Sequence, residues 1–138
     1  MIILDTNVIS EVMKPNPSPR VVHWLGQYPP SRLFTTAMTQ AEILYGLELL
    51  PKGKRRSALQ SAVEAMFAEE FAGRILPFDS EAAQVFPHIA CARRALGRPV
   101  TQFDAQIAAI AQTRGGAVAT RNTADFEGCG IAVLNPWS

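Results

Sequence analysis

The spacing of apolar and polar positions along the chain predicts five short strands and six helices. Apolar runs, mostly rich in β-branched residues, predict strands at 2–4, 33–36, 74–77, 117–120 and 131–134. Apolar positions at helical spacing predict helices at about 7–14, 19–28, 39–50, 54–71, 80–96 and 102–114. Two helices separate each of the first four strands, and a loop separates the last two. This alternation predicts an α/β fold with a central, mostly parallel five-stranded sheet, in a single domain over residues 1–138.

Capping residues and apolar faces refine the helices. The expected N-caps of the first, third and sixth helices are Thr6 or Asn7, Thr39, and Thr101. Glu42 stands three residues after Thr39, which is the form of a capping box. The fourth helix carries an apolar face from residue 59 to residue 71, and Phe103 is assigned to the apolar face of the sixth.

Four acidic residues follow the predicted strands. Asp5 directly follows the first strand, and Glu42 and Asp104 fall in the first turns of the third and sixth helices. Asp125 falls in the loop between the last two strands. Right-handed crossovers place the carboxyl ends of parallel strands at one edge of the sheet, where ligand crevices form. We therefore expect these four carboxylates to meet in one crevice.

Each of these acids also has a purely structural explanation. Glu42 could bond back to its own N-cap amide, and Asp104 could interact with the helix dipole. Asp5 could cap the first helix, and Asp125 could form an Asx-turn. Caps do not explain why all four fall at one edge without a basic partner nearby in sequence. Their joint placement favours a site for Mg²⁺ or Mn²⁺, because these hard ions take carboxylate oxygens.

Composition limits the kinds of protein and of ligand site that fit this chain. The net charge of +1 is too small to indicate nucleic-acid binding by itself. Two cysteines, Cys91 and Cys129, do not form a disulfide framework, so we expect reduced thiols in a cytoplasmic protein. No apolar run is long enough for a membrane span. The histidines, His23 and His88, fall in predicted helices away from the edge and are expected to be structural or surface residues.

Basic residues form two runs. One comprises Lys52, Lys54, Arg55 and Arg56, and the other comprises Arg93, Arg94 and Arg98. Either run could track an RNA backbone, although a solvated face is the simpler interpretation of the first. Arg98 and Arg121 are better placed for RNA contact because they flank the acidic motifs.

Four motifs in order resemble those of PIN-domain proteins, and specifically the VapC-type, FitB-like toxins of type II toxin–antitoxin pairs. The motifs comprise residues 3–7, 39–46, 103–109 and 120–128, and Asn135, Pro136 and Trp137 fit the usual ending. The resemblance covers essentially the whole chain and implies a PIN-domain-like α/β/α sandwich. It is least specific between residues 52 and 98.

The resemblance implies a metal-dependent endoribonuclease that uses Mg²⁺ or Mn²⁺ to hydrolyse RNA phosphodiester bonds. Asp5, Glu42, Asp104 and Asp125 would be its catalytic and metal-binding residues, with Asp5 and Asp104 as the first choice of direct ligands. Residues expected to position the RNA or support the acids are Thr6, Thr120, Asn122 and Arg121. The implied partners are an RNA substrate, a cognate antitoxin and a second copy of the chain, with operator DNA bound through the antitoxin.

Two other functions fit an acidic crevice. One is a non-catalytic module that binds RNA or a protein partner, and the other is a metal phosphohydrolase that acts on small phosphoesters. A route through a phosphoaspartate is disfavoured, because Asp5-Thr6-Asn7 lacks the second Asp of the haloacid-dehalogenase motif.

Overall fold

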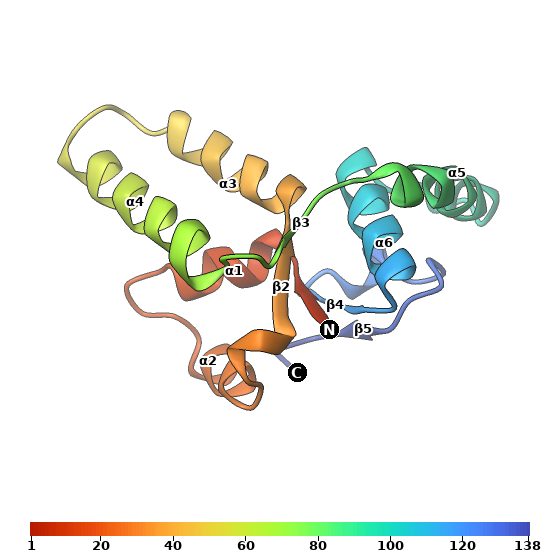
Figure 1. The fold of residues 1–138 in the computed structure, drawn as a ribbon, viewed down its shortest axis with the longest axis horizontal. Helices are drawn as coiled ribbons and strands as arrows, with labels where there is room; N and C mark the ends of the chain where they lie inside the picture. The colour runs from red at the N-terminus through yellow and green to blue at the C-terminus, as the bar shows by residue number, and fades with distance from the viewer.

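A computed structural model describes all 138 residues (Figure 1). The strands are β1 (Ile2–Leu4), β2 (Leu33–Thr36), β3 (Ile75–Leu76), β4 (Ala117–Ala119) and β5 (Val133–Leu134). The helices are α1 (Thr6–Val12), α2 (Pro19–Gly26), α3 (Ala37–Glu48), α4 (Lys54–Ala65), α5 (Ser80–Ala95) and α6 (Gln102–Arg114). Every predicted strand and helix is present, and all four strand pairings are parallel. The predicted α/β fold with a five-stranded parallel sheet is confirmed.

The strand order β3-β2-β1-β4-β5 creates a switch point at the centre of the sheet. The chain runs outward from β1 through β2 to β3, and then returns to the other side of β1 as β4. Ile3 of β1 pairs with Phe34 of β2 and with Val118 of β4. Ligand crevices in such sheets form beyond the strand ends where the order reverses. Asp5 lies at this position, and its backbone N–H donates to the Ala119 carbonyl at 3.0 Å.

Helices cover both faces of the sheet. Helices α1 to α4 lie on one side and α5 and α6 on the other (Figure 1). The central strand serves both cores, because successive side chains point to opposite faces. Ile2 and Leu4 belong to the α1–α4 core, whereas Ile3 belongs to the α5–α6 core. Strand β1 is therefore fixed from both faces, and Asp5 follows it directly.

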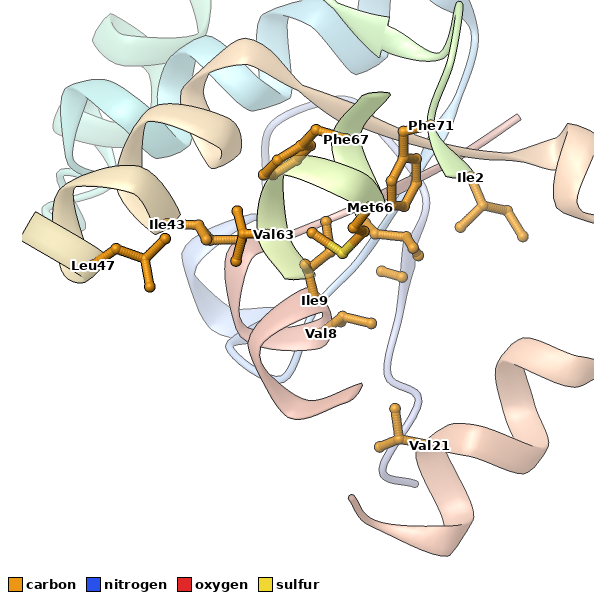
Figure 2. Close-up of a cluster of buried hydrophobic side chains, with 12 residues drawn as sticks. Ile2, Val8, Ile9, Val21, Ile43, Leu47, Val63, Met66, Phe67 and Phe71 are labelled. Atoms are coloured by element: carbon orange, nitrogen blue, oxygen red, sulfur yellow. The ribbon is translucent and has the colours of Figure 1, made fainter. Parts of the chain in front are cut away.

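The α1–α4 core predicts that two valines, both in helices, contribute very differently to the free energy of unfolding. Val63 of α4 is fully buried in the same hydrophobic cluster as Ile9 and Ile43 (Figure 2), whereas Val22 of α2 is 47% exposed. Val63→Ala is expected to lower the free energy of unfolding by about 2 kcal/mol through lost burial and the cavity left behind. Val22→Ala should change it by less than about 0.5 kcal/mol. Urea denaturation measures both, and equal losses would contradict the assignment of this core.

Two predicted N-caps are wrong. Helix α3 is capped by Thr36, whose Oγ1 accepts from the Thr39 N–H at 3.2 Å, so the N-cap lies three residues earlier than expected. Glu42 therefore lies in the second turn, where it has no N-cap amide to bond. Helix α1 is capped by Asp5, whose Oδ1 accepts from the Thr6 N–H at 2.8 Å. The Thr101 cap of α6 is confirmed, with the Asp104 N–H donating to its hydroxyl at 3.2 Å.

Other details also differ from the sequence predictions. The apolar face of the long fourth helix is confirmed, but α4 passes into a π-helical segment, η2 (Met66–Glu70), before it ends. The assignment of Phe103 to the apolar face of α6 is wrong, since this side chain is 43% exposed. The grouping of Arg93 with basic residues on the surface is also wrong, since Arg93 is 3% exposed.

Candidate active site

An open crevice of about 710 Å³, lined almost entirely by polar residues, lies beyond the carboxyl ends of the central strands. It is lined by ten residues: Asp5, Thr6, Asn7, Ser10, Glu42, Thr101, Gln102, Phe103, Asp104 and Asn122. Five of the eight site residues predicted from the sequence are in this lining. Thr120, Arg121 and Asp125 are not, and each has a different position relative to the crevice.

Asp5 forms the buried floor of the crevice. The residue is 6% exposed, and both of its carboxylate oxygens accept hydrogen bonds. Oδ1 accepts from the Thr6 N–H at 2.8 Å, and Oδ2 accepts from the Thr120 hydroxyl at 2.8 Å. Burial raises the pKa of Asp5, the bonds from Thr120 and Thr6 lower it, and the charge of Asp125 raises it. Burial has the larger effect on this pKa. The hydrogen bonds therefore hold the carboxylate in place but compensate its charge only in part.

Asp104 carries the largest shift in this group. Burial, followed by the charges of Asp5 and Asp125, raises its pKa to about 6. The bond with Thr101 lowers this pKa only in part, and the charge of Glu42 raises it further. A favourable interaction with the helix dipole would lower the pKa of Asp104, so that interaction does not dominate at this residue. The charges of Asp5 and Asp125 raise the pKa of Asp104 in addition to burial, which is the largest cause of the shift.

Glu42 and Asp125 complete the cluster from two further segments. Burial raises the pKa of Glu42, a hydrogen bond from Thr6 lowers it, and the charge of Asp5 raises it. Asp125 ends a 3₁₀ turn, η3 (Thr123–Asp125), in the β4–β5 connection. Its charge acts on both Asp5 and Asp104. Asp5, Glu42 and Asp104 therefore share the crevice, whereas Asp125 lies outside its lining and acts on Asp5 and Asp104 through its charge.

Thr120 is fully buried and supports Asp5 from behind. Its hydroxyl donates to Asp5 and accepts from the Asn122 N–H at 3.0 Å. Asn7 donates to the Thr120 hydroxyl at 3.2 Å and to Asp5 Oδ2 at 3.3 Å, and its own Oδ1 accepts from the Arg121 N–H at 3.1 Å. From the sequence, Asn7 is expected to be a candidate N-cap and part of the first motif, with no role of its own at the site. Its place two residues after Asp5, in the same motif, was the available signal.

Thr120→Val tests the support given to Asp5. The change keeps the shape of the side chain but removes the only hydroxyl donor to Asp5 Oδ2. We expect the affinity for Mn²⁺ to fall by about tenfold, as is typical for the loss of a group that orients a metal ligand. Titration of the metal-free protein with Mn²⁺ measures this. Thr113→Val, which removes a hydroxyl bonded to the Ile110 carbonyl on α6, is the matched control, and an equal loss in both variants would contradict the prediction.

The basic residues lie outside the crevice lining. The guanidinium of Arg121 stacks over the Trp137 ring at 5.2 Å from its centroid. Arg98 pairs with Glu127 at 3.3 Å, and Arg56 pairs with Glu48 at 2.8 Å. Both histidines lie outside the lining, as expected. No lysine or arginine forms an ion pair with Asp5, Glu42, Asp104 or Asp125.

The residues present fit a hard divalent cation. The cluster offers only oxygen donors, and its repulsion is not relieved by any basic side chain. No three acidic, histidine or cysteine side chains are grouped as ligands of one ion. Mg²⁺ does not require such a cage, because it is usually bound through one or two carboxylates and several waters. Two carboxylates of this cluster would meet that requirement.

Comparison with known proteins identifies the family. A PIN-domain family model matches residues 2–128. The chain is 39% identical to the VapC ribonuclease Y4jK of Sinorhizobium fredii over 99% of this chain and 98% of that protein. It is 41% identical to the toxin FitB of Neisseria gonorrhoeae over 99% of each chain.

A solved structure extends the likeness to three dimensions. It contains FitAB bound to an IR36 DNA fragment, and it superimposes with a TM-score of 0.94 at 40% identity over 100% of this chain and 96% of that one. No helix of the present structure is both long and apolar enough to cross a membrane. The fold, the four motifs and these relatives agree: the chain belongs to the PIN-domain family, among the VapC- and FitB-type toxins.

Proposed function

We propose that this protein is a metal-dependent endoribonuclease and the toxin of a type II toxin–antitoxin pair, with residues 1–138 forming one PIN domain. The observation that carries the proposal is the cluster of Asp5, Glu42, Asp104 and Asp125, whose charges repel one another beside no basic group. A binding surface for RNA alone has no use for such a cluster, because RNA is itself an anion. A relative that is 39% identical to this chain is named a VapC ribonuclease, which supports RNA as the substrate.

The proposal gives each side chain a role. Asp5 and Asp104 are the direct ligands, while Glu42 and Asp125 ligate the ion or orient the attacking water. When bound, Mg²⁺ or Mn²⁺ activates water and neutralises charge on the leaving oxygen. Thr6 and Asn122, which line the crevice, contact the RNA phosphate. Thr120 supports Asp5 from its buried position. Arg121 would have to move its guanidinium off the Trp137 ring in order to contact RNA.

We infer that the protein partner is an antitoxin. A solved structure of FitAB bound to an IR36 DNA fragment supports a protein partner and an assembly on DNA. We expect this assembly to contain two copies of the toxin and to hold operator DNA through the antitoxin. A groove of about 320 Å³ joins the crevice at Thr6, Ser10 and Glu42. Its apolar wall is formed by Met13, Ile43, Leu47, Leu50 and Leu59 from the α1 C-terminus, α3, α4 and the α3–α4 turn. An amphipathic antitoxin segment fits this groove and would end over the acidic cluster.

RNA cleavage is the test of the proposed reaction. Purified protein is incubated with tRNA, rRNA and single-stranded oligonucleotides in Mg²⁺, in Mn²⁺ and in chelator. Cleavage is expected only with metal, and Asp5→Asn should abolish it in a folded protein. Activity that survives in Asp5→Asn or in chelator would contradict the proposal.

Two outcomes would favour the competing functions. Hydrolysis of small phosphoesters without any RNA cleavage would indicate a phosphohydrolase. RNA binding that requires metal but yields no product across the panel would indicate a binding module.

A further inference from the structure

Arg93 of α5 is a buried cation without an acidic partner. The residue is 3% exposed, and its Nη1 donates to the Ala124 carbonyl at 3.0 Å and the Glu127 carbonyl at 2.6 Å. Nε is buried and has no hydrogen-bond partner. The ion pairs of the structure involve other residues, so the two backbone carbonyls are the only protein groups that accept hydrogen bonds from this guanidinium.

The two carbonyls bracket Asp125. Ala124 precedes it, and Glu127 follows two residues later. Between them, the Phe126 side chain is 1% exposed and packs in the α5–α6 core. The Asp125 N–H also donates to the Asn122 carbonyl at 3.0 Å. The segment that carries Asp125 belongs to no strand, so its position depends on these few contacts.

This arrangement lowers the stability of the folded protein, which is hard to explain if Arg93 has only a structural role. Burying a guanidinium without a carboxylate costs free energy, and the unpartnered Nε adds to that cost. An apolar side chain of similar length would fill the same space without a buried charge. A residue that breaks a stability rule in this way is expected near a functional site.

We infer that Arg93 is a positioning residue for the candidate metal site. Its guanidinium holds residues 124–127 so that the Asp125 carboxylate faces Asp5 and Asp104. This inference rests on the proposed function, because it assigns Asp125 to the same ion. Arg93 does not touch the ion or the RNA, and it acts only through the backbone on either side of Asp125.

Mn²⁺ titration of the metal-free protein tests the inference without any RNA substrate. Arg93→Met removes both hydrogen bonds, and the affinity for Mn²⁺ should fall by about tenfold or more. Arg93→Lys keeps the charge but reaches one carbonyl, so its loss should be smaller. Arg98→Met is the matched control, because Arg98 holds the same segment only through its surface pair with the Glu127 side chain. Its affinity should match that of the wild type.

A double-mutant cycle with Asp125→Asn separates positioning from general stability. If Arg93 acts through Asp125, Arg93→Met should cause no further loss of Mn²⁺ affinity in the Asp125→Asn background. Losses that add fully would overturn the inference, as would wild-type affinity in Arg93→Met. If Arg93→Met does not fold, Arg93→Lys carries the cycle. Absence of Mn²⁺ binding in the wild type would instead refute the proposed function, and this inference with it.

Discussion

Asp104→Asn is expected to abolish RNA cleavage and at the same time to stabilise the metal-free protein. A metal ligand contributes several kcal/mol to the reaction, so the rate should fall by about a thousandfold. Stability should change in the opposite direction, because the amide side chain would place no charge in this partly buried position and none beside Asp5 and Asp125. A pKa raised from 3.8 to about 6 corresponds to at most roughly 3 kcal/mol, and solvent screening at this half-buried position leaves about 1 kcal/mol.

Chemical denaturation in chelator at pH 7.5, beside a cleavage assay in Mn²⁺, measures both effects. Glu81→Gln is the matched control, since Glu81 is also an acid in the first turn of a helix but lies outside the cluster. It should leave cleavage unchanged and should not stabilise the protein. Loss of stability in Asp104→Asn would contradict the claim that the clustered acids destabilise the protein when no cation is bound.

The second large effect is a dependence of metal binding on pH. The pKa of Asp104 is about 6, so its carboxylate is mostly protonated at pH 5 and mostly ionised at pH 7. Because the cation competes with this proton, the apparent affinity for Mn²⁺ should rise by about tenfold between pH 5 and pH 7. Cleavage at subsaturating Mn²⁺ should rise in parallel, and Asp104→Asn should lose this rise.

Stability without metal should follow the opposite trend. A carboxyl group whose pKa is raised by folding favours the folded state at low pH, where it is protonated in both states. That contribution is lost as pH rises from about 4 through about 6, the interval between the unfolded and folded pKa values of Asp104. Unfolding in chelator and in saturating Mn²⁺ across this range separates the two trends. Parallel pH curves under the two conditions would contradict the assignment of Asp104 as a ligand.

The fold was largely predictable because its signals are local. Apolar runs and helical spacing indicated all the strands and helices, and their alternation indicated the parallel sheet. The errors arose where local rules compete. Thr36 and Thr39 both suit an N-cap, and only the end of β2 decides between them. Phe103 fits a helical apolar face by spacing, yet it lies over the crevice because the face that packs inward is formed by Ile107 and Ile110.

The acids of the candidate site were predictable, and the family resemblance also pointed to Thr120 as a residue that positions the RNA or supports them, but the contacts made by Asn7 and Arg93 were not predictable. Asp5, Glu42 and Asp104 follow elements whose order places them at one edge. The roles of Thr120 and Asn7 depend on side chains that meet across more than one hundred residues, which no local pattern encodes. Arg93 shows the same limit, since a basic residue on a helix suggests a solvated face. Only the packing of α5 against the β4–β5 connection places its guanidinium in the interior.

The most direct test of the central claim is the position of a bound ion. Crystals grown without metal and then soaked in Mn²⁺ give an anomalous scattering peak wherever the ion resides. The account predicts a peak in the crevice within about 2.2 Å of carboxylate oxygens of Asp5 and Asp104, with waters completing the coordination. A peak only at other carboxylates, or an unchanged acidic cluster at saturating Mn²⁺, would contradict it.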